Sequence, residues 1–169
     1  MMIMKTKDEK MFPMIRPPRP TKDEYYLNIA LAVSSRSTCL KRHYGCVIVK
    51  NDEIISTGYN GNPRGMENCC DRGFCERLEV PHNSGNYNNC FSVHAEQNAM
   101  LSASREEMIG ATAYLAGVEY MIDKDKSSRY QEDVYGYIEV DAEPCPICFR
   151  MLKNAGVEKV INRRGEVCM

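Results

Sequence analysis

Nine cysteines in a chain of 169 residues constrain this protein more than any other feature of its sequence. Residues 1–20 mix charged side chains with prolines, which is not the pattern of a secretory signal. We therefore expect a cytoplasmic, reducing location in which disulfides do not form. Cys46 lies in an apolar run and Cys168 near the C-terminus, and we expect both to be small buried hydrophobic residues. The other seven lie in polar or turn-rich surroundings and indicate metal binding: Cys39, Cys69, Cys70, Cys75, Cys90, Cys145 and Cys148.

The composition excludes two classes of partner. Hydrophobic residues make up 43% of the chain and charged residues 27%, which is typical of a globular domain with one core. The net charge of −1 argues against stable nucleic-acid binding and against an anionic membrane surface, because both select for a basic excess. No apolar run approaches the ~18 residues that a membrane helix needs.

The hydrophobic pattern predicts an extended N-terminal arm, residues 1–20, followed by a single domain, residues 21–169. Thr21-Lys22-Asp23-Glu24 fits a capping box, which predicts a helix to about residue 35. Apolar runs at residues 45–49 and 54–58 predict a β-hairpin with its turn at Asn51-Asp52. Further helices are expected at residues 94–104 and 146–155, the second ended by Gly156, and strands at residues 111–116 and 157–161. This order predicts a mixed α/β sheet covered by helices on both faces.

Two segments do not fit a simple alternation of strands and helices. Residues 58–90 are rich in Gly, Asn, Pro, Cys and Arg, and they have too few apolar side chains to fold by burial. We expect a bound metal to order this loop region. Residues 117–143 are expected to form an extended hairpin insertion, with arms at residues 119–122 and 134–140 and a charged tip at 123–133.

Two short motifs carry the chemistry. His94-Ala95-Glu96 and Pro144-Cys145-Pro146-Ile147-Cys148 each stand at the start of an expected helix. One imidazole and two thiolates give zinc three protein ligands and leave a fourth position for water, as in catalytic zinc sites. Glu96 is close enough to that water to move protons without binding the metal. A lone histidine can be a cap and a lone Cys-x-x-Cys a redox pair, but together they match the zinc nucleobase deaminase signature.

Three more stretches accompany these motifs. Residues 37–42 (Ser-Thr-Cys-Leu-Lys-Arg) precede residues 45–49 (Gly-Cys-Val-Ile-Val), residues 56–65 contain Gly58-Tyr59-Asn60-Gly61, and residues 93–99 read Val-His-Ala-Glu-Gln-Asn-Ala. With them the chain resembles the deoxycytidylate (dCMP) deaminase branch of the cytidine deaminase superfamily, from about residue 19 to residue 161. The resemblance implies a three-layer α/β/α fold with a central mixed sheet of about five strands.

The resemblance also implies an activity and its residues. The reaction is hydrolytic deamination of dCMP to dUMP and ammonia, in which zinc hydroxide attacks C4 and Glu96 shuttles protons. His94, Cys145 and Cys148 hold the catalytic zinc, Asn60 hydrogen-bonds the sugar, and the Ala95 amide helps to hold the pyrimidine. Family members oligomerise, so we expect a homo-oligomer. Many are activated by dCTP and inhibited by dTTP, which makes these nucleotides candidate effectors.

Substrate phosphate and a second metal add further candidates. Lys41, Arg42 and Arg64 flank the expected pocket, and any of them could donate a charge-assisted hydrogen bond to a 5′-phosphate. By resemblance to members with a structural zinc, four thiols are expected to hold a second ion, and Cys69 or His82 could replace one of them. The four are Cys39, Cys70, Cys75 and Cys90.

Two alternatives remain open at the level of sequence. The substrate could be another cytosine nucleoside, a modified cytosine nucleotide or a tRNA adenosine, although the near-neutral charge argues against tRNA. The second alternative is a non-catalytic, zinc-stabilised regulatory module. Glu96 argues against it, because a structural metal site has no use for an unliganded carboxylate.

Overall fold

A six-stranded sheet forms the centre of the computed structural model, which describes residues 18–167 except 79, 82–83, 85–88 and 123–133. The strands are β1 (Arg42–Lys50), β2 (Glu53–Tyr59), β3 (Thr112–Ile122), β4 (Val134–Val140), β5 (Lys159–Asn162) and β6 (Gly165–Val167). The helices are α1 (Lys22–Ser34), α2 (Cys69–Arg72), α3 (Ala95–Leu101), α4 (Arg105–Met108) and α5 (Pro146–Ala155).

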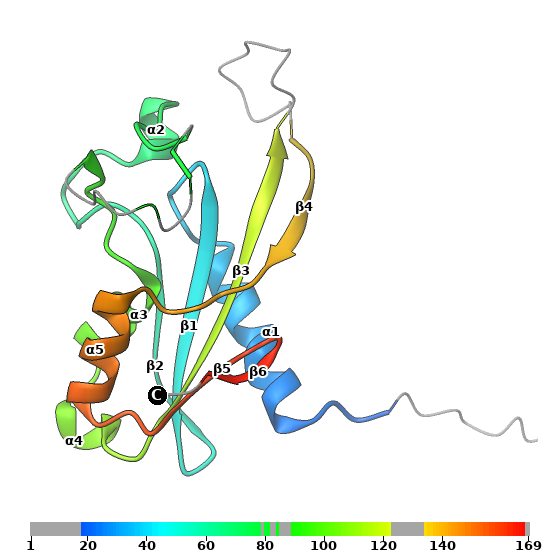
Figure 1. The fold of residues 1–169 in the computed structure, drawn as a ribbon, viewed down its shortest axis with the longest axis vertical. Coiled ribbons are helices and arrows are strands. Elements are labelled where there is room, and N and C mark those ends of the chain that lie inside the picture. Colours follow the sequence, from blue (N-terminus) through cyan, green and yellow to red (C-terminus); the bar gives the residue numbers. More distant parts are fainter. Residues whose placement is uncertain (1–17, 79, 82–83, 85–88, 123–133, 168–169) are drawn as a thin grey trace, which may run out of the picture.

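The strand order is β2-β1-β3-β5-β6, and β4 pairs with β3 beyond the part that β5 occupies. Only the β3–β5 pairing is parallel among these described strands, and the others are antiparallel. The sheet is therefore mixed, as predicted, with six strands where the sequence indicated about five. Figure 1 shows the β3–β4 pair extending past the rest of the sheet, at the same end as α2.

Helices cover both faces of the sheet, so the predicted three-layer α/β/α architecture is confirmed. Because side chains alternate along a strand, Cys46 and Ile48 of β1 face α3 and α5, whereas Val47 and Val49 face α1. β3 alternates in the same way. Figure 1 shows α1 on the side of the sheet opposite to α3 and α5.

Local signals fixed the ends of several elements as predicted. Thr21 is the N-cap of α1, and its hydroxyl and the Glu24 carboxylate form the capping box. Gly156 ends α5 with φ 97°, in the left-handed region that favours glycine. Asn51 and Asp52 form the tight turn between β1 and β2, with φ of 51° and 68°.

β3 differs from its prediction, because the two expected strands at residues 111–116 and 119–122 are one continuous strand. Gly117 makes the continuity possible: a Cβ at this residue would lie 2.4 Å from Cδ1 of Tyr44, so only glycine lets that ring cross the strand. β1 also runs alongside it as far as the Arg42–Glu119 pair. The predicted hairpin arms are therefore present, whereas the tip at residues 123–133 lies outside the described residues.

The rest of the described chain adds little regular structure. Most of the predicted N-terminal arm lies outside the described residues, and residues 18–20 are exposed.

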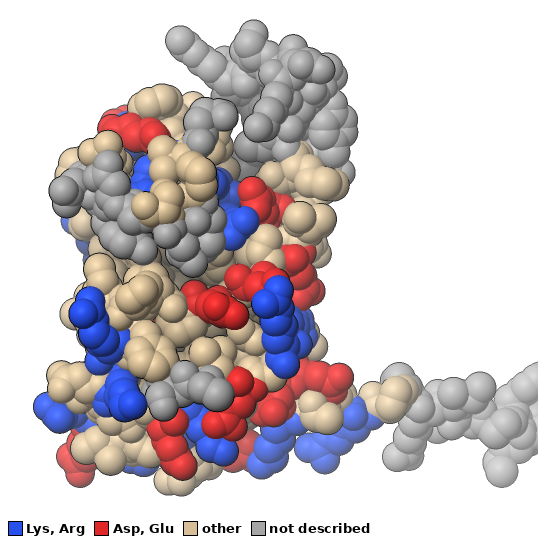
Figure 2. All heavy atoms as spheres, in the orientation of Figure 1, with Lys and Arg blue, Asp and Glu red and all other residues tan. Residues whose placement is uncertain are grey.

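Within the part of the chain that is described, no helix has both the length and the apolarity to cross a bilayer. Acidic and basic side chains are interspersed over the face seen in Figure 2.

Candidate active site

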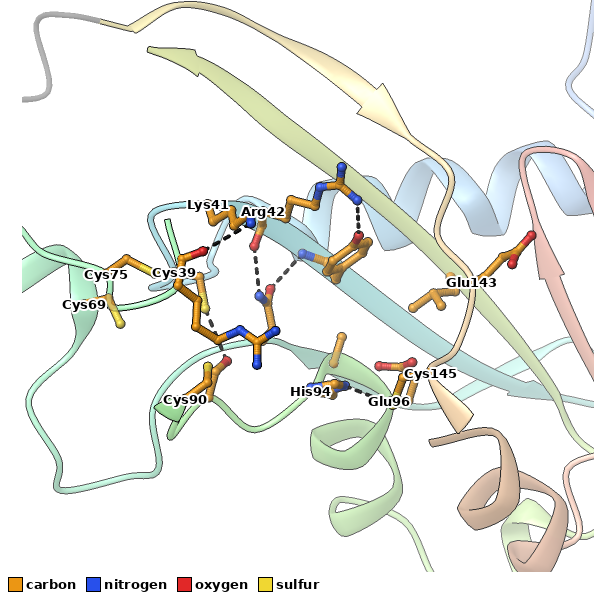
Figure 3. A pocket seen from close by; sticks show the side chains of 16 residues that line it. Cys39, Lys41, Arg42, Cys69, Cys75, Cys90, His94, Glu96, Glu143 and Cys145 are labelled. Atoms are coloured by element: carbon orange, nitrogen blue, oxygen red, sulfur yellow. Dashed lines mark hydrogen bonds between the residues drawn. The ribbon is translucent and has the colours of Figure 1, made fainter. Parts of the chain in front are cut away.

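Two helix starts bring the motif residues together on one face of the sheet. His94 is the N-cap residue of α3, Glu96 lies in its first turn, and Cys145 is the N-cap residue of α5. Gly58 of β2 lets α3 approach closely, because a Cβ there would lie 2.3 Å from the Ala95 carbonyl oxygen. In Figure 3, His94, Glu96 and Cys145 lie side by side at one end of a cavity.

The three predicted zinc ligands are in position to bind one ion. His94 Nδ1 lies 3.6 Å from Cys145 Sγ and 3.4 Å from Cys148 Sγ. Tetrahedral zinc with bonds of about 2.3 Å to sulfur and 2.0 Å to nitrogen separates such atoms by roughly 3.5 Å. The donor set and its spacing therefore fit zinc. In the described part of the chain, this is the one group whose ligand atoms lie within 4.8 Å of one another.

The protonation of the site suits both metal binding and proton transfer. A hydrogen bond with the Cys148 thiol, helped by His94, lowers the pKa of Cys145 to about 3. The same hydrogen bond raises the pKa of Cys148, so one of the two thiols is ionised even without metal. Burial raises the pKa of Glu96, which is 5% exposed. A raised pKa makes the Glu96 carboxylate a better proton acceptor, as the first step of a proton shuttle requires.

Asn60 lies in the cavity wall, where the resemblance placed a sugar contact. Its Oδ1 accepts a hydrogen bond from the Tyr44 amide at 2.7 Å, and its Nδ2 donates to the Arg42 carbonyl at 2.9 Å. These bonds join the end of β2 to the start of β1. One N–H and one lone pair of the amide remain for a ligand, so the sugar contact stays a prediction.

The three cations predicted to contact phosphate lie in different surroundings. Arg42 lines the cavity and forms an ion pair with Glu119, with Nη2 2.8 Å from Oε2. Lys41 also lines the cavity, and its ammonium donates to the carbonyl oxygens of Arg77, at 3.1 Å, and of Val80. Arg64 is exposed and is not part of the cavity lining.

The sequence argument missed two charged residues of the cavity lining, Arg77 and Glu143. Arg77 lies two residues after Cys75. The hydrogen bond with Cys145 has the larger effect on His94 and raises its pKa, whereas the charge of Arg77 lowers it. Glu143 directly precedes the Pro-Cys motif. Their closeness in sequence to metal-ligand candidates was the only signal that could have singled them out.

The structure brings together three of the four cysteines predicted for a second metal. Cys39, Cys75 and Cys90 line the same cavity, but their companion there is Cys69. Cys70 is exposed, and its sulfur lies 3.6 Å from Asp71 Oδ1. The two cysteines differ because α2 begins at Cys69, and successive residues of a helix point in different directions. The alternative ligand at residue 82 lies outside the described residues.

The four thiols of this cavity are less tightly gathered than the His94 set. Burial raises the pKa of Cys39 to about 11 and also raises that of Cys75, so both thiols are neutral without a metal. Cys69 and Cys90 are close enough to both of them to interact electrostatically. None of the cysteines in the described residues forms a disulfide.

Comparison with known proteins places this site in a family. The model for the cytidine and deoxycytidylate deaminase zinc-binding region matches residues 20–163. The deoxycytidylate deaminase of Mycobacterium phage D29 is 35% identical over 146 residues, which cover 85% of this chain and 94% of the relative. That of Saccharomyces cerevisiae is 37% identical over 159 residues, or 92% of this chain, which spans only 48% of the length of this yeast relative.

A solved structure agrees with the sequence relatives. The dCMP deaminase of cyanophage S-TIM5, in complex with dCMP and dUMP, has a TM-score of 0.57 and 28% identity. The match covers 86% of this chain and 83% of that one. The resemblance predicted from the motifs is confirmed: this chain belongs to the cytidine and deoxycytidylate deaminase family.

Proposed function

We propose that this protein deaminates dCMP to dUMP and ammonia by hydrolysis. The observation that carries the proposal is the buried Glu96 carboxylate beside a His94–Cys145–Cys148 set with zinc-ligand spacing. The relatives named deoxycytidylate deaminase and the S-TIM5 enzyme with dCMP and dUMP support this choice of substrate.

The residues divide the work between holding the metal and moving protons. A zinc ion held by His94, Cys145 and Cys148 supplies Lewis-acid activation of a water molecule. Glu96 accepts one proton of the attacking water and passes it to N3 of the pyrimidine, where it stays in the product. Glu96 then transfers the second proton of the same water to the amino nitrogen, which leaves as ammonia. Ala95 is fully buried in the cavity wall, where its backbone can hold the base.

The decisive test replaces Glu96 with glutamine. Glu96→Gln should keep its zinc, measured by plasma mass spectrometry, and lose roughly 10²–10⁴-fold in kcat because general acid–base catalysis is removed. Glu53→Gln is the matched control, since Glu53 is an exposed carboxylate at the start of β2. Wild-type turnover by Glu96→Gln would remove the proposed role of this residue.

The substrate itself is tested by an ammonia-release screen over cytosine nucleosides and nucleotides. Three cations line the cavity, Lys41, Arg42 and Arg77, so we expect dCMP to be preferred to deoxycytidine. Preference for another cytosine nucleotide would keep the chemistry and change the substrate. The absence of turnover on every cytosine substrate, despite bound zinc, would favour the non-catalytic regulatory module.

Oligomeric state and regulation complete the proposal. We expect a homo-oligomer that responds to dCTP as an activator and to dTTP as an inhibitor. Light scattering with and without each nucleotide, together with activity at sub-saturating dCMP, tests both properties. A monomer whose rate is unaffected by either nucleotide would contradict them.

We further propose a second, structural zinc bound by Cys39, Cys69, Cys75 and Cys90. The support is that these four thiols line one cavity and that Cys69, Cys75 and Cys90 come from a segment with few buried apolar residues. A Cys₄ set leaves no ligand position for water, so this ion would order the cavity wall and take no part in catalysis.

Two adjacent cysteines provide a matched pair for testing the second metal. Cys69→Ser should reduce the zinc content from two to about one ion per chain and lower Tm, because one of four ligands is lost. Cys70→Ser should leave both values unchanged. The reverse result would restore Cys70 as the ligand, and one zinc in the fully reduced wild-type protein would exclude the second site.

A further inference from the structure

The two ends of the cavity differ in their chemistry. The metal-ligand candidates and Glu96 lie at the end where α3 and α5 begin, whereas Lys41 lies at the opposite end, near Cys75 (Figure 3). Arg77, two residues beyond Cys75, also lines the cavity. A ligand that fits this arrangement has a polar ring at one end and an anion at the other.

Lys41 holds the backbone that carries Arg77. Its ammonium donates to the Arg77 carbonyl oxygen at 3.1 Å and to the Val80 carbonyl oxygen. Two consecutive turns also fix this segment. The Leu78 amide donates a hydrogen bond to the Cys75 carbonyl oxygen and the Val80 amide donates one to the Arg77 carbonyl oxygen, each at 3.1 Å. Because a carbonyl oxygen carries no net charge, Lys41 keeps its positive charge while it fixes this segment.

Arg42 contributes differently to the cavity. Its guanidinium donates through Nε and Nη2 to one oxygen of Glu119, at 2.9 and 2.8 Å. The pair has no net charge, and an anion next to Arg42 would also approach the Glu119 carboxylate. The Lys41 ammonium, whose acceptors are uncharged carbonyl oxygens, therefore attracts a phosphate dianion more strongly than the Arg42–Glu119 pair does, and it draws the phosphate toward the segment that carries Arg77.

We propose that Arg77 binds the 5′-phosphate of the nucleotide substrate and that Lys41 is a positioning residue for the Arg77 segment. The proposal rests on the proposed deamination of dCMP and assigns the specificity for nucleotide over nucleoside to one side chain. A guanidinium can donate two parallel hydrogen bonds to phosphate oxygens, which gives it both strength and geometry as a phosphate reader.

The test compares kcat/KM for dCMP with kcat/KM for deoxycytidine. Arg77→Gln should lower the dCMP value roughly 10- to 100-fold, as the loss of a charge-assisted hydrogen bond predicts, and leave deoxycytidine nearly unchanged. Arg36→Gln, at an exposed residue that follows the C-cap of α1, is the control and should change neither value. An unchanged ratio in Arg77→Gln, or a loss in Arg64→Gln in its place, would overturn the assignment.

Binding gives a readout that does not depend on turnover. In the Glu96→Gln background, calorimetry should show tighter binding of dCMP than of deoxycytidine, and adding Arg77→Gln should remove the difference. If the Arg77-intact protein already binds both equally, the nucleotide part of the proposed function fails. If it prefers dCMP and the Arg77 variant keeps that preference, only the present inference fails.

A double-mutant cycle tests the role of Lys41. If Lys41 acts through Arg77, Lys41→Met should lower the dCMP-to-deoxycytidine ratio, and the double variant should be no worse than Arg77→Gln alone. Additive losses would make Lys41 an independent phosphate ligand and would overturn its assignment as a positioning residue. An unchanged ratio in Lys41→Met would overturn it as well.

Discussion

Asn60 shows how one side chain can serve the sheet and the site together. Its side-chain amide accepts from the Tyr44 N–H and donates to the Arg42 carbonyl, and its backbone carbonyl oxygen accepts from Ser37 Oγ at 2.8 Å. With 8% of its surface exposed, few water molecules can replace these bonds. The residue therefore links the start of β1 to the end of β2 in the wall of the cavity.

We predict that Asn60→Ala lowers the free energy of unfolding by about 1–3 kcal/mol, because it leaves two backbone groups of β1 without partners. Urea unfolding at constant zinc measures this. Asn62→Ala is the control, since Asn62 donates to an exposed loop carbonyl, that of Glu67. If Asn60→Ala lost activity at unchanged stability, its main role would be a ligand contact such as the predicted sugar hydrogen bond.

Single residues of the site differ in how far the sequence could predict them. His94, Glu96, Cys145 and Cys148 follow from motif spacing, because helix starts fix where such side chains point. The choice between Cys69 and Cys70 depends on the orientation of the four-residue helix α2, which spacing does not specify. Arg77 lies close to Cys75 in the sequence, but only tertiary contacts decide that it lines the cavity.

At the scale of elements, α3 carries the histidine and the glutamate of the site, and its distance from β2 is set by one residue. A Cβ on Gly58 would lie 2.3 Å from both the Ala95 carbonyl oxygen and the Ala99 amide nitrogen. Both are backbone atoms, so the helix as a whole would have to move. Gly58 thus controls where α3 presents the catalytic motif.

Gly58→Ala should lower stability by about 1–3 kcal/mol through overpacking and should weaken zinc binding, because α3 carries His94 away from α5. Unfolding curves and zinc content measure the two effects. Gly136→Ala in β4 is the matched control, since its Cβ would lie 3.7 Å from Met121 Cε, an ordinary contact. Equal behaviour of the two variants would show that α3 tolerates the displacement.

Elements were predictable where their ends depend on neighbouring residues. α1 and α5 begin and end as their caps indicate, and the β1–β2 turn lies at the predicted Asn51 and Asp52. β3 was divided incorrectly, because its continuity depends on Tyr44 lying against Gly117 and on β1 pairing alongside. These contacts join residues far apart in the chain.

At the scale of the whole molecule, residues 62–92 are the part least supported by the core. Among the described residues of this segment, Cys69 is the one buried hydrophobic side chain. Chelation of the two proposed zinc ions should therefore expose this segment while the sheet persists. Limited trypsin digestion should then cut first after Arg72 and Arg77, and added zinc should restore protection. Equal cleavage with and without zinc would contradict a metal-ordered segment.

The contact between α1 and the sheet also makes the free energy of unfolding depend on pH in the alkaline range. Tyr26 donates to Asp52 Oδ1 at 2.7 Å, and Tyr114 donates to Asp23 Oδ1 at 2.9 Å. The hydrogen bond to Asp52 raises the pKa of Tyr26 to about 12, and burial with the Asp23 contact raises that of Tyr114. Each hydroxyl is therefore held in its protonated form by the fold.

A tyrosine with a raised pKa contributes its full stabilisation of the folded state at any pH below its pKa in the unfolded chain, about 10. This contribution is lost as pH rises toward the pKa in the folded chain. Between pH 10 and 12 the unfolded chain releases the Tyr26 proton while the folded chain keeps it, so the free energy of unfolding should fall. For one proton the slope is at most about 1.4 kcal/mol per pH unit. Urea unfolding of wild type and Tyr26→Phe at pH 9, 10 and 11 isolates this residue, because all other titrations are common to both proteins. The variant should be less stable at pH 9 and should lose less stability by pH 11, whereas parallel pH profiles would show that Tyr26 ionises equally in both states.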